Sequence, residues 1–348
     1  MDFNIEALSQ KAGVSTATVS RALNDKPGVS EKRRKAIKEM ASQLGYRPNP
    51  QASALRSRTR SGWTLLTRSS TSQITQHRNQ HFLSTLREME SSIQVITTAP
   101  NEDFKIALNR IWHRPPAVLL VHGIPESESQ ALEEMGRDSG TAVVSIDRTS
   151  KVFDSVCIDR AEGTRLAARL ILTGGAKHPI FFTQRKWEHV SNDERNRGIF
   201  KAYKEIGLTP TKDQFVCIEG ADAEMGRKIT LELLESRYVD AIFTYSDEVG
   251  YGVLRALFEK GIKVPEDIRL VGFDDLPHSS MTTPNLTSVG QPVQEMVDLA
   301  ISLAQERQAN PQKEIQSLQL PTRLIVRESC PLLNHSHREN TFLTPQSI

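Results

Sequence analysis

Residues 13–24 read GVSTATVSRALN and predict a turn followed by a short helix. Gly13 is a residue type that ends helices, and Ser15 is one that begins them by capping the first free backbone N–H groups. Val19 and Leu23 are four residues apart, so in a helix they face the same way and are expected to be buried. This stretch therefore predicts a helix that packs through one face behind a tight turn.

Two further helices are predicted on either side of it. Residues 5–12 repeat apolar side chains at Ile5, Leu8 and Ala12, which is helical spacing. The third helix is capped by Ser30 and stops at Gly45. Its apolar face holds Ile37, Met40, Ala41 and Leu44. Three short helices at this spacing predict a compact helix-turn-helix headpiece over residues 1–46.

The charge of the chain is concentrated at the same end. Residues 1–60 hold 12 Lys and Arg against 5 Asp and Glu, a charge of +7, whereas the remaining residues carry −5. A basic head on a weakly acidic body suggests binding to nucleic acid, because neutralised phosphates supply most non-specific affinity. A solvated basic tail is the alternative that charge alone leaves open.

In a helix-turn-helix, the first residues of the second helix enter the major groove. Thr16 can hydrogen-bond a base edge or touch a thymine methyl, Ala17 can make only an apolar contact, and Arg21 can grip guanine with two hydrogen bonds. The candidate DNA contacts in the headpiece are Ser15, Thr16, Ala17, Ser20, Arg21, Asn24, Lys32 and Arg33. Residues 47–60, RPNPQASALRSRTR, begin with two prolines that cannot continue a helix, and they predict a hinge.

Beyond Gly62 the chain alternates apolar runs with amphipathic stretches. The apolar runs are WTLLT, SIQVITTA, AVLLVHG, AVVSID, PIFFTQ, FVCIEG, AIFTYS and IRLVGFDD. Because these runs lack a two-residue alternation, they predict strands buried on both faces, in doubly wound α/β domains with parallel sheets. The last residues, 331–348, lack a heptad pattern and are expected to be a disordered tail.

A resemblance sharpens these expectations. The stretch GVSTATVSRALN, followed by VSEKRRKAI and LGYRPNPQASALRSR, closely resembles the headpiece of the lactose/galactose-repressor (LacI/GalR) family, and the similarity continues to about residue 330. It implies that Thr16 and Ala17 occupy the first reading positions, followed by Arg21. It also matches Leu55, with Arg56 beside it, to the family's hinge leucine, which inserts between base pairs in the minor groove. An apolar wedge of that kind unstacks a base step for a few kcal/mol. Packing of Leu55 under the headpiece is the alternative.

For the body, the resemblance implies a periplasmic sugar-binding fold with two subdomains joined by three crossovers. One would comprise residues 61–158 and 290–320, the other residues 159–289 and 321–330. A ligand would lie in the cleft at the carboxyl ends of the strands. The segments IDR, NDERNRGI, TYSDEVGYGVL and VGFDD match family motifs, and with two aromatic positions they give the candidate effector residues Phe82, Asp147, Trp187, Arg195, Ser246 and Asp274.

Some of these assignments have open alternatives. Trp187 could stack on a sugar ring or a base, or simply pack, and Asp247 is expected to cap a helix rather than bind a ligand. The segment SQITQHRNQHF departs from the family's DxxNPFF loop, since only Asn79 and Phe82 keep the pattern. The effector could therefore be an atypical sugar, a nucleoside, a phosphorylated metabolite held by Arg148 or Arg185, or absent.

Several function classes are not expected. No phosphate loop, HExxH, GxSxG or strand-linked GxGxxG motif is present, so an enzyme is not predicted. The three cysteines are far apart and unpaired in pattern, which predicts neither a metal site nor a disulfide framework, and no cofactor is expected. No signal peptide or membrane span is recognisable, so a cytoplasmic protein is expected.

The sequence thus predicts a regulator, by family default a repressor, that binds a pseudo-palindromic double-stranded DNA operator as a homodimer and responds to a small molecule. A DNA-binding regulator that is effector-independent or controlled by a protein partner is the alternative.

Overall fold

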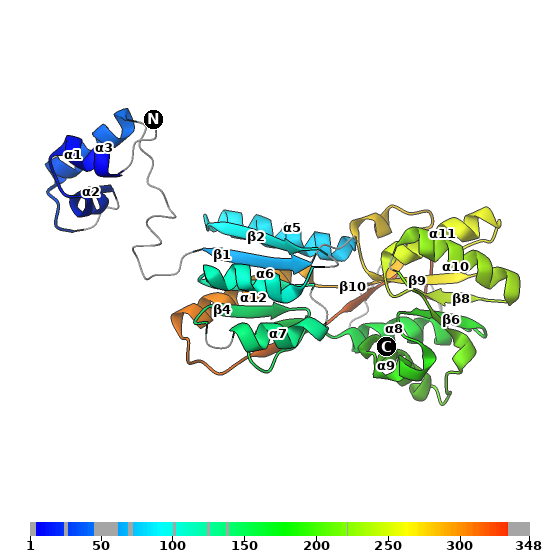
Figure 1. The fold of residues 1–348 in the computed structure, drawn as a ribbon. Coiled ribbons are helices and arrows are strands. Elements are labelled where there is room, and N and C mark those ends of the chain that lie inside the picture. Colours follow the sequence, from blue (N-terminus) through cyan, green and yellow to red (C-terminus); the bar gives the residue numbers. More distant parts are fainter. Residues whose placement is uncertain are drawn as a thin grey trace. The chain divides into compact units, whose positions relative to one another are not determined.

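The computed structural model describes residues 5–23, 27–44, 62–68, 72–99, 102–123, 126–136, 139–220 and 222–332. It divides into two compact units, Met1–Ser61 and Gly62–Ile348, which are described one at a time (Figure 1). Several predictions fall outside the described residues: the hinge at 47–60 with Leu55 and Arg56, residue Asn24, and residues 333–348 of the expected tail.

The first unit is the headpiece. It holds the three predicted helices, α1 (Ile5–Ala12), α2 (Thr16–Leu23) and α3 (Glu31–Gln43). The Ser15 hydroxyl accepts a hydrogen bond from the Thr18 backbone N–H at 3.2 Å, which confirms Ser15 as the cap of α2. The buried core consists of Leu8, Val19, Ala22, Ile37 and Ala41. Leu23 is only half-buried, because α2 packs against both neighbouring helices and Ala22 takes the second buried position.

The first sheet of the body has six strands in the order β11-β5-β4-β3-β1-β2, and all neighbouring strands are parallel. These strands are β1 (Trp63–Arg68), β2 (Ile93–Thr98), β3 (Val118–His122), β4 (Ala142–Ile146), β5 (Asp154–Ile158) and β11 (Ser317–Leu320). One face is covered by α5 (Gln73–Glu88) and α12 (Val293–Ala309), the other by α6 (Phe104–His113) and α7 (Glu126–Gly136). This sheet with its helices is called the first lobe.

The second sheet also has six strands, in the order β12-β10-β9-β8-β6-β7. They are β6 (Pro179–Thr183), β7 (Phe215–Cys217), β8 (Ala241–Phe243), β9 (Arg269–Asp274), β10 (Thr287–Gly290) and β12 (Arg323–Ile325). Its helices are α8 (Arg160–Thr173) and α9 (Glu194–Glu205) on one face, and α10 (Ala223–Ser236) and α11 (Asp247–Glu259) on the other. Short 3-10 helices are η1 (Trp187–Asn192), η2 (Lys212–Gln214) and η3 (Pro277–Ser280). This sheet with its helices is called the second lobe.

The predicted fold class of doubly wound parallel sheets is confirmed, with one exception at an edge. Strand β12 pairs with β10 in the antiparallel direction, whereas every other pair in the second sheet is parallel. Side chains of the inner strands alternate between two cores, as expected for strands covered on both faces. In β3, for example, Leu120 enters the core shared with α5 and α12, while Leu119 enters the core under α6 and α7.

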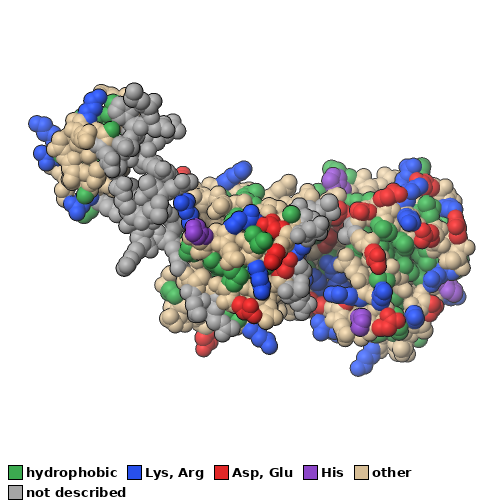
Figure 2. All heavy atoms as spheres, in the orientation of Figure 1, with side chains coloured by type: hydrophobic (Ala, Val, Ile, Leu, Met, Phe, Trp, Pro, Cys, Tyr) green, Lys and Arg blue, Asp and Glu red, His purple; other side chains and the backbone are tan. Residues whose placement is uncertain are grey.

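The chain passes between the two sheets three times: from β5 into α8, from β10 into α12, and from β11 into β12. The residues that follow parallel strands gather at the carboxyl edge of each sheet. In Figure 2 the surface is hollowed between the two lobes, and Lys and Arg side chains lie inside the hollow.

Glycines hold the helix pairs of the second lobe at close distance. A Cβ atom on Gly198 would lie 2.0 Å from the Ala161 carbonyl oxygen, so α9 can approach α8 only with glycine at this position. Gly252 has the same role between α11 and α10, where a Cβ atom would lie 1.9 Å from the Ala223 carbonyl oxygen. Because side chains cannot fit between these backbones, each helix pair has a fixed geometry. The site residues at the start of α9 and α11 are therefore held in fixed positions.

Candidate functional site

The exposed side of α2 carries the predicted base-reading residues. Ala17 and Arg21 are exposed, and Thr16 and Ser20 are partly exposed, whereas Val19 and Ala22 face the core. Ser15 has a different environment, because its hydroxyl caps α2 and also lies 3.0 Å from the Thr18 hydroxyl. This surface of α2 therefore exposes short side chains and one arginine.

The start of α3 carries the predicted phosphate contacts. Lys32 and Arg33 are exposed. Their neighbour Arg34 is tied back into the headpiece, because its guanidinium pairs with Glu31 at 3.4 Å and donates to the Val29 carbonyl at 3.4 Å. Lys and Arg side chains are visible on the surface of this unit in Figure 2.

A buried polar cluster occupies the carboxyl ends of strands in the body. His122 ends β3, Asp147 follows β4, and Asp274 ends β9. Both aspartates have left-handed backbone, with φ of 72° at Asp147 and 114° at Asp274. Such conformations cost non-glycine residues ~1–3 kcal/mol and cluster at functional sites, where the surrounding fold enforces them.

Asp147 is held between two arginines from different lobes. Its carboxylate lies 2.7 Å from the Arg78 guanidinium of α5 and also accepts a hydrogen bond from Arg160, the first residue of α8. Burial alone would raise the pKa of Asp147, but the charges of Arg160 and Arg78 outweigh it and hold the pKa well below its ordinary value. The carboxylate is therefore ionised and paired with both arginines.

Asp274 is in a different electrostatic state. One of its oxygens accepts a hydrogen bond from the Gln291 amide at 2.5 Å, and the side chain is almost completely buried. Burial raises its pKa to about 7, although Arg195 and Arg78 act in the opposite direction. The amide oxygen of Gln291 accepts from Arg78, so this one amide connects Arg78 to Asp274.

Arg195 reaches the same cluster from the start of α9. Asp193 caps that helix by accepting from the backbone N–H groups of Arg195 and Asn196 at 3.0 and 3.3 Å. The guanidinium lies over the Phe273 ring, 4.6 Å from its centroid, and donates to the Tyr245 carbonyl at 3.0 Å. Burial and the nearby charge of Arg160 lower the pKa of Arg195, while Asp274 and Asp147 raise it.

Ser246 and Asp247 have structural roles at the start of α11. Ser246, not Asp247, is the cap of the helix: its hydroxyl accepts from the Val249 backbone N–H at 3.3 Å. The Asp247 carboxylate instead accepts from the Leu276 backbone N–H and from the hydroxyls of Ser279 and Ser288, at 2.6–2.7 Å. The expectation that Asp247 caps the helix was wrong by one residue, since its side chain turns inward to bind the loop after β9.

The two aromatic candidates lie outside this polar cluster. Phe82 is completely buried in the core beneath the first sheet, together with Leu65 and Leu86, so a ligand cannot touch it in this structure. Trp187 packs against the rings of Phe200 and Phe215, with centroids 6.2 and 5.4 Å away. For Trp187, the structure favours the packing alternative over stacking on a ligand.

Four polar members of the cluster were not identified from the sequence: Arg78, His122, Arg160 and Gln291. One signal for Arg78 was available. It is four residues before Phe82 and eight before Leu86, on the apolar face of α5, where all three are buried. A charged residue on a buried helix face needs a partner, which marks it as a candidate site residue.

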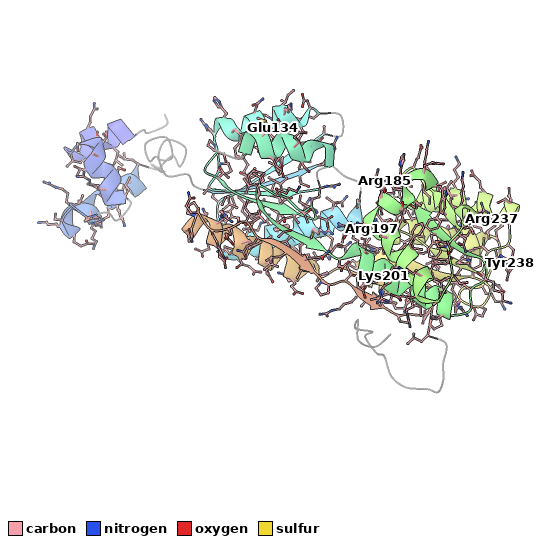
Figure 3. All side chains as sticks on the ribbon, turned by 90° about the horizontal axis from the view of Figure 1, so that it is seen from below. Glu134, Arg185, Arg197, Lys201, Arg237 and Tyr238 are labelled. Carbon is pink, nitrogen blue, oxygen red and sulfur yellow. The ribbon has the colours of Figure 1, made fainter. Side chains whose placement is uncertain are left out.

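Arg185, considered above as a phosphate ligand, has a different position. Its side chain is 59% exposed and lies 3.9 Å from the Asp193 carboxylate. In the view of Figure 3, Arg185 and Arg197 lie on the side of the second lobe that faces the first. Arg185 is therefore at the rim rather than in the buried cluster.

The described part of the chain contains neither a membrane-spanning helix nor a metal-binding group. None of its helices has the length and apolar character needed to cross a membrane. No group of three or more His, Cys, Asp or Glu side chains among these residues is placed to hold a metal ion.

Comparisons with known proteins identify similar chains over almost the whole length. The family described as bacterial regulatory proteins, lacI family, matches residues 5–49, and the periplasmic binding protein-like domain matches residues 168–330. The HTH-type transcriptional regulator GalR of Escherichia coli (strain K12) is 30% identical over 354 residues, with 96% of this chain and 98% of that protein covered. Catabolite control protein A of Priestia megaterium is 28% identical over 336 residues, covering 94% and 99%.

Solved structures share the fold. The lac repressor dimer bound to operator and the anti-inducer ONPF matches with a TM-score of 0.80 and 23% identity, covering 95% of this chain and 100% of that one. The complex of the transcriptional regulator CelR with cellobiose matches with a TM-score of 0.67 and 26% identity, covering 94% and 99%. The headpiece and the two-lobed body thus occur together in these structures.

Proposed function

The chain belongs to the lacI family of bacterial regulatory proteins and is a DNA-binding transcription regulator; on that premise, we propose that it is a repressor whose operator affinity is controlled by a small molecule. A homodimer would bind a pseudo-palindromic operator through α2 of each headpiece. The effector would bind between the two lobes, beside Arg195 and Asp274.

One observation carries the proposal for the effector. Arg195 and Asp274 come from different elements, yet they lie close enough for each to shift the pKa of the other. Arg195 can donate two parallel hydrogen bonds, and Asp274 has one oxygen left to accept from a ligand. Polar groups that converge in this way between two lobes are typical of small-molecule sites. The similar CelR structure contains cellobiose, which supports a sugar-like ligand here.

The homodimer is supported by an exposed apolar surface. Phe258 in α11 and Met281 after η3 are 76% and 79% exposed. The Tyr251 hydroxyl lies 2.9 Å from the Ser279 hydroxyl and so ties these two elements together. An interface on this face would remove both side chains from water. The lac repressor structure is a dimer, and sedimentation of this protein should likewise give a dimer rather than a monomer or a tetramer.

The predicted hinge completes the proposal. Residues 47–60 would become ordered on the operator, and Leu55 would insert between base pairs there. Fixing each backbone residue costs roughly 1–2 kcal/mol, so a modest change in the spacing of two hinges could decide whether both become ordered. Leu55→Ala should reduce operator affinity and DNA bending while leaving effector binding unchanged.

The experiment that tests the proposal is a thermal-shift screen with sugars, sugar acids and nucleosides, followed by operator binding with each hit. A hit should change operator affinity in the wild-type protein. Arg195→Ala and Asp274→Ala should still bind operator but should no longer respond. If no compound changes either melting temperature or operator binding, the regulator is effector-independent or controlled by a protein partner.

A further inference from the structure

We propose that the effector carries an acidic group, a carboxylate or a phosphate, and that Arg78 is the residue that selects for it. This inference rests on the proposed function, because it specifies the chemistry of the ligand at the same site. It follows from the donors and acceptors of the buried cluster.

Arg78 is an almost completely buried arginine. Its side chain is 3% exposed, and its partners are the Asp147 carboxylate, the Gln291 amide oxygen and the His122 ring. A buried charge is tolerated only when it is paired and hydrogen-bonded, so this side chain needs all of these contacts. Even so, its Nε–H has no acceptor among the described residues, although that nitrogen is buried.

A second chain of hydrogen bonds fixes the orientation of Arg78. Burial and the charge of Arg78 lower the pKa of His122 to about 3, so the ring is neutral. A guanidinium can only donate, and the His122 Nε2 atom, 3.1 Å away, must therefore accept. The proton is then on Nδ1, which donates to the Asn79 side-chain oxygen at 3.2 Å, and Asn79 donates to the Thr67 hydroxyl at 3.3 Å.

The charges of the cluster do not balance. Three guanidinium groups, those of Arg78, Arg160 and Arg195, face two carboxylates, those of Asp147 and Asp274. Because burial brings the pKa of Asp274 to about 7, one of these carboxylates is partly neutral at physiological pH. The two other acidic neighbours are more exposed: Glu194 lies 3.7 Å from Arg160 and is 35% exposed, and Asp193, the cap of α9, is 28% exposed and faces the rim residue Arg185. An excess of positive charge in a buried site favours an anionic ligand.

The hydrogen bonds show the same imbalance. Both oxygens of Asp147 already accept hydrogen bonds from arginines, so little of its acceptor capacity remains for a ligand. Donors, in contrast, are in surplus, because the Nε–H groups of Arg78 and Arg195 are both buried without an acceptor in the described residues. Each hydroxyl of a neutral polyol brings a donor that needs its own acceptor along with its acceptor lone pairs, whereas an ionised carboxylate only accepts and carries the charge that pairs with a guanidinium. The acidic ligand therefore completes the cluster better.

The test uses pairs of ligands that differ in one acidic group. Hexuronates, aldonates and hexose phosphates, each beside its neutral parent sugar, are titrated into the full-length protein by calorimetry at 0.15 M KCl. We expect at least one acid to bind tenfold or more tightly than its parent and to change operator affinity. Whether the carboxylates or the phosphates bind identifies the source of the acidic group.

Variants of Arg78 then assign the selectivity. Arg78→Gln should lower affinity for the acid by tenfold or more and bring it close to that of the neutral sugar, while Arg78→Lys should keep part of the preference. Arg110→Gln is the matched control, because it removes an exposed arginine of the same lobe. Operator binding without ligand should be unchanged in the Arg110→Gln control.

The outcomes separate the two proposals. If a neutral sugar binds and regulates as well as its acid, the anionic ligand is wrong and the proposed function stands. If no member of the panel and no nucleoside of the first screen binds or alters operator affinity, both are wrong. If Arg78→Gln does not fold, the wild-type comparison and Arg78→Lys decide the question.

Discussion

The backbone N–H of Gln73 donates to the Glu248 carboxylate at 2.9 Å, so the start of α5 in the first lobe is capped by a side chain from α11 in the second. Ser72, the residue at the N-cap position of α5, makes no capping hydrogen bond with its own side chain. Glu248 therefore supplies both an acceptor and a negative charge to a helix end that lacks its own cap. The contact also joins the two lobes directly.

Removing this contact should loosen α5. Loss of a helix cap costs ~0.5–2 kcal/mol, so Glu248→Ala should lower the melting temperature of the body by a few degrees and speed hydrogen exchange at residues 73–76. Glu248→Gln keeps an acceptor and should recover most of the loss. Unchanged exchange at these residues in Glu248→Ala would show that the helix end does not depend on the second lobe.

The predictions for the headpiece distinguish residues that recognise bases from residues that bind the phosphate backbone. Thr16→Ala and Ala17→Ser change groups on the exposed side of α2, so each should alter the preferred base at one position of a half-site, measured by selection from random DNA. Lys32→Ala and Arg33→Ala should weaken binding to all sequences alike. Each lost phosphate contact should reduce the slope of log affinity against log salt by about one, or about two in a dimer. A selected consensus that Thr16→Ala leaves untouched would remove Thr16 from the reading surface.

The stability of the body should depend on pH in a defined direction. Burial raises the pKa of Asp247 to about 8 and that of Asp274 to about 7, against an ordinary value of 3.8. Both groups hold protons in the folded state that the unfolded chain releases above about pH 4. Their contribution to stability is thus complete below that pH and is lost as the pH rises through 7 and 8. Each released proton changes the unfolding free energy by ~1.4 kcal/mol per pH unit.

We therefore expect the melting temperature to fall between pH 6 and pH 8.5. Asp247→Asn should flatten this decline, whereas Asp298→Asn, which removes an exposed carboxylate of α12, should not. Asp147 has the opposite effect on stability, because its pKa is lowered in the folded state. Its contribution to the unfolding free energy is present above the ordinary pKa of 3.8 and is lost only as the pH falls below that value. A melting temperature that rises from pH 6 to pH 8.5 would contradict the protonated state of Asp247.

Close packing of α8 and α9 predicts a sensitive position. Gly198→Ala would place a methyl group 2.0 Å from the Ala161 carbonyl oxygen and 2.1 Å from the Thr164 hydroxyl, both on the neighbouring helix. Overpacking of this kind costs ~1–3 kcal/mol or more, and chemical denaturation should detect it. Lys201→Ala in the same helix is the control, because that side chain is 62% exposed (Figure 3), and its effect should stay within ~0.5 kcal/mol.

Strands that are continuous apolar runs could be predicted from the sequence, and strands that lack such a run could not. The inner strands β3 and β4 are continuous apolar runs, and the sequence placed them correctly. Strands β5, β10, β11 and β12, with the sequences DSVCI, TSVG, SLQL and RLI, were not identified, because they are short and contain polar residues. The pairing of β11 and β12 is fixed by partners far away in the chain, which local periodicity does not reveal.

Some residues of the candidate site were predicted correctly from the sequence, and others were not. Asp147, Arg195 and Asp274 stand at strand or helix ends in recognisable segments, and the structure brings them into one cluster. Phe82 and Trp187 were proposed because aromatic rings can stack on a ligand. Both rings instead pack against apolar side chains of the protein. Arg78 was overlooked because a helical pattern reveals the buried side of α5 but not the polar groups from other elements that lie against it.

The three passages of the chain between the sheets set the order in which the lobes can be completed during synthesis. The first sheet begins with β1 at residue 63, yet its edge strand β11 ends only at Leu320, after nearly the whole second lobe has been made. Helix α12, which covers β3, β4 and β5, also emerges late. The lobe that starts first on the ribosome therefore stays incomplete until almost the end of synthesis, with part of one apolar face uncovered while most of the second lobe is being translated. Such a face is a target for chaperones and for aggregation, so production of this protein should be more sensitive to translation speed through residues 159–320 than its folded stability would suggest.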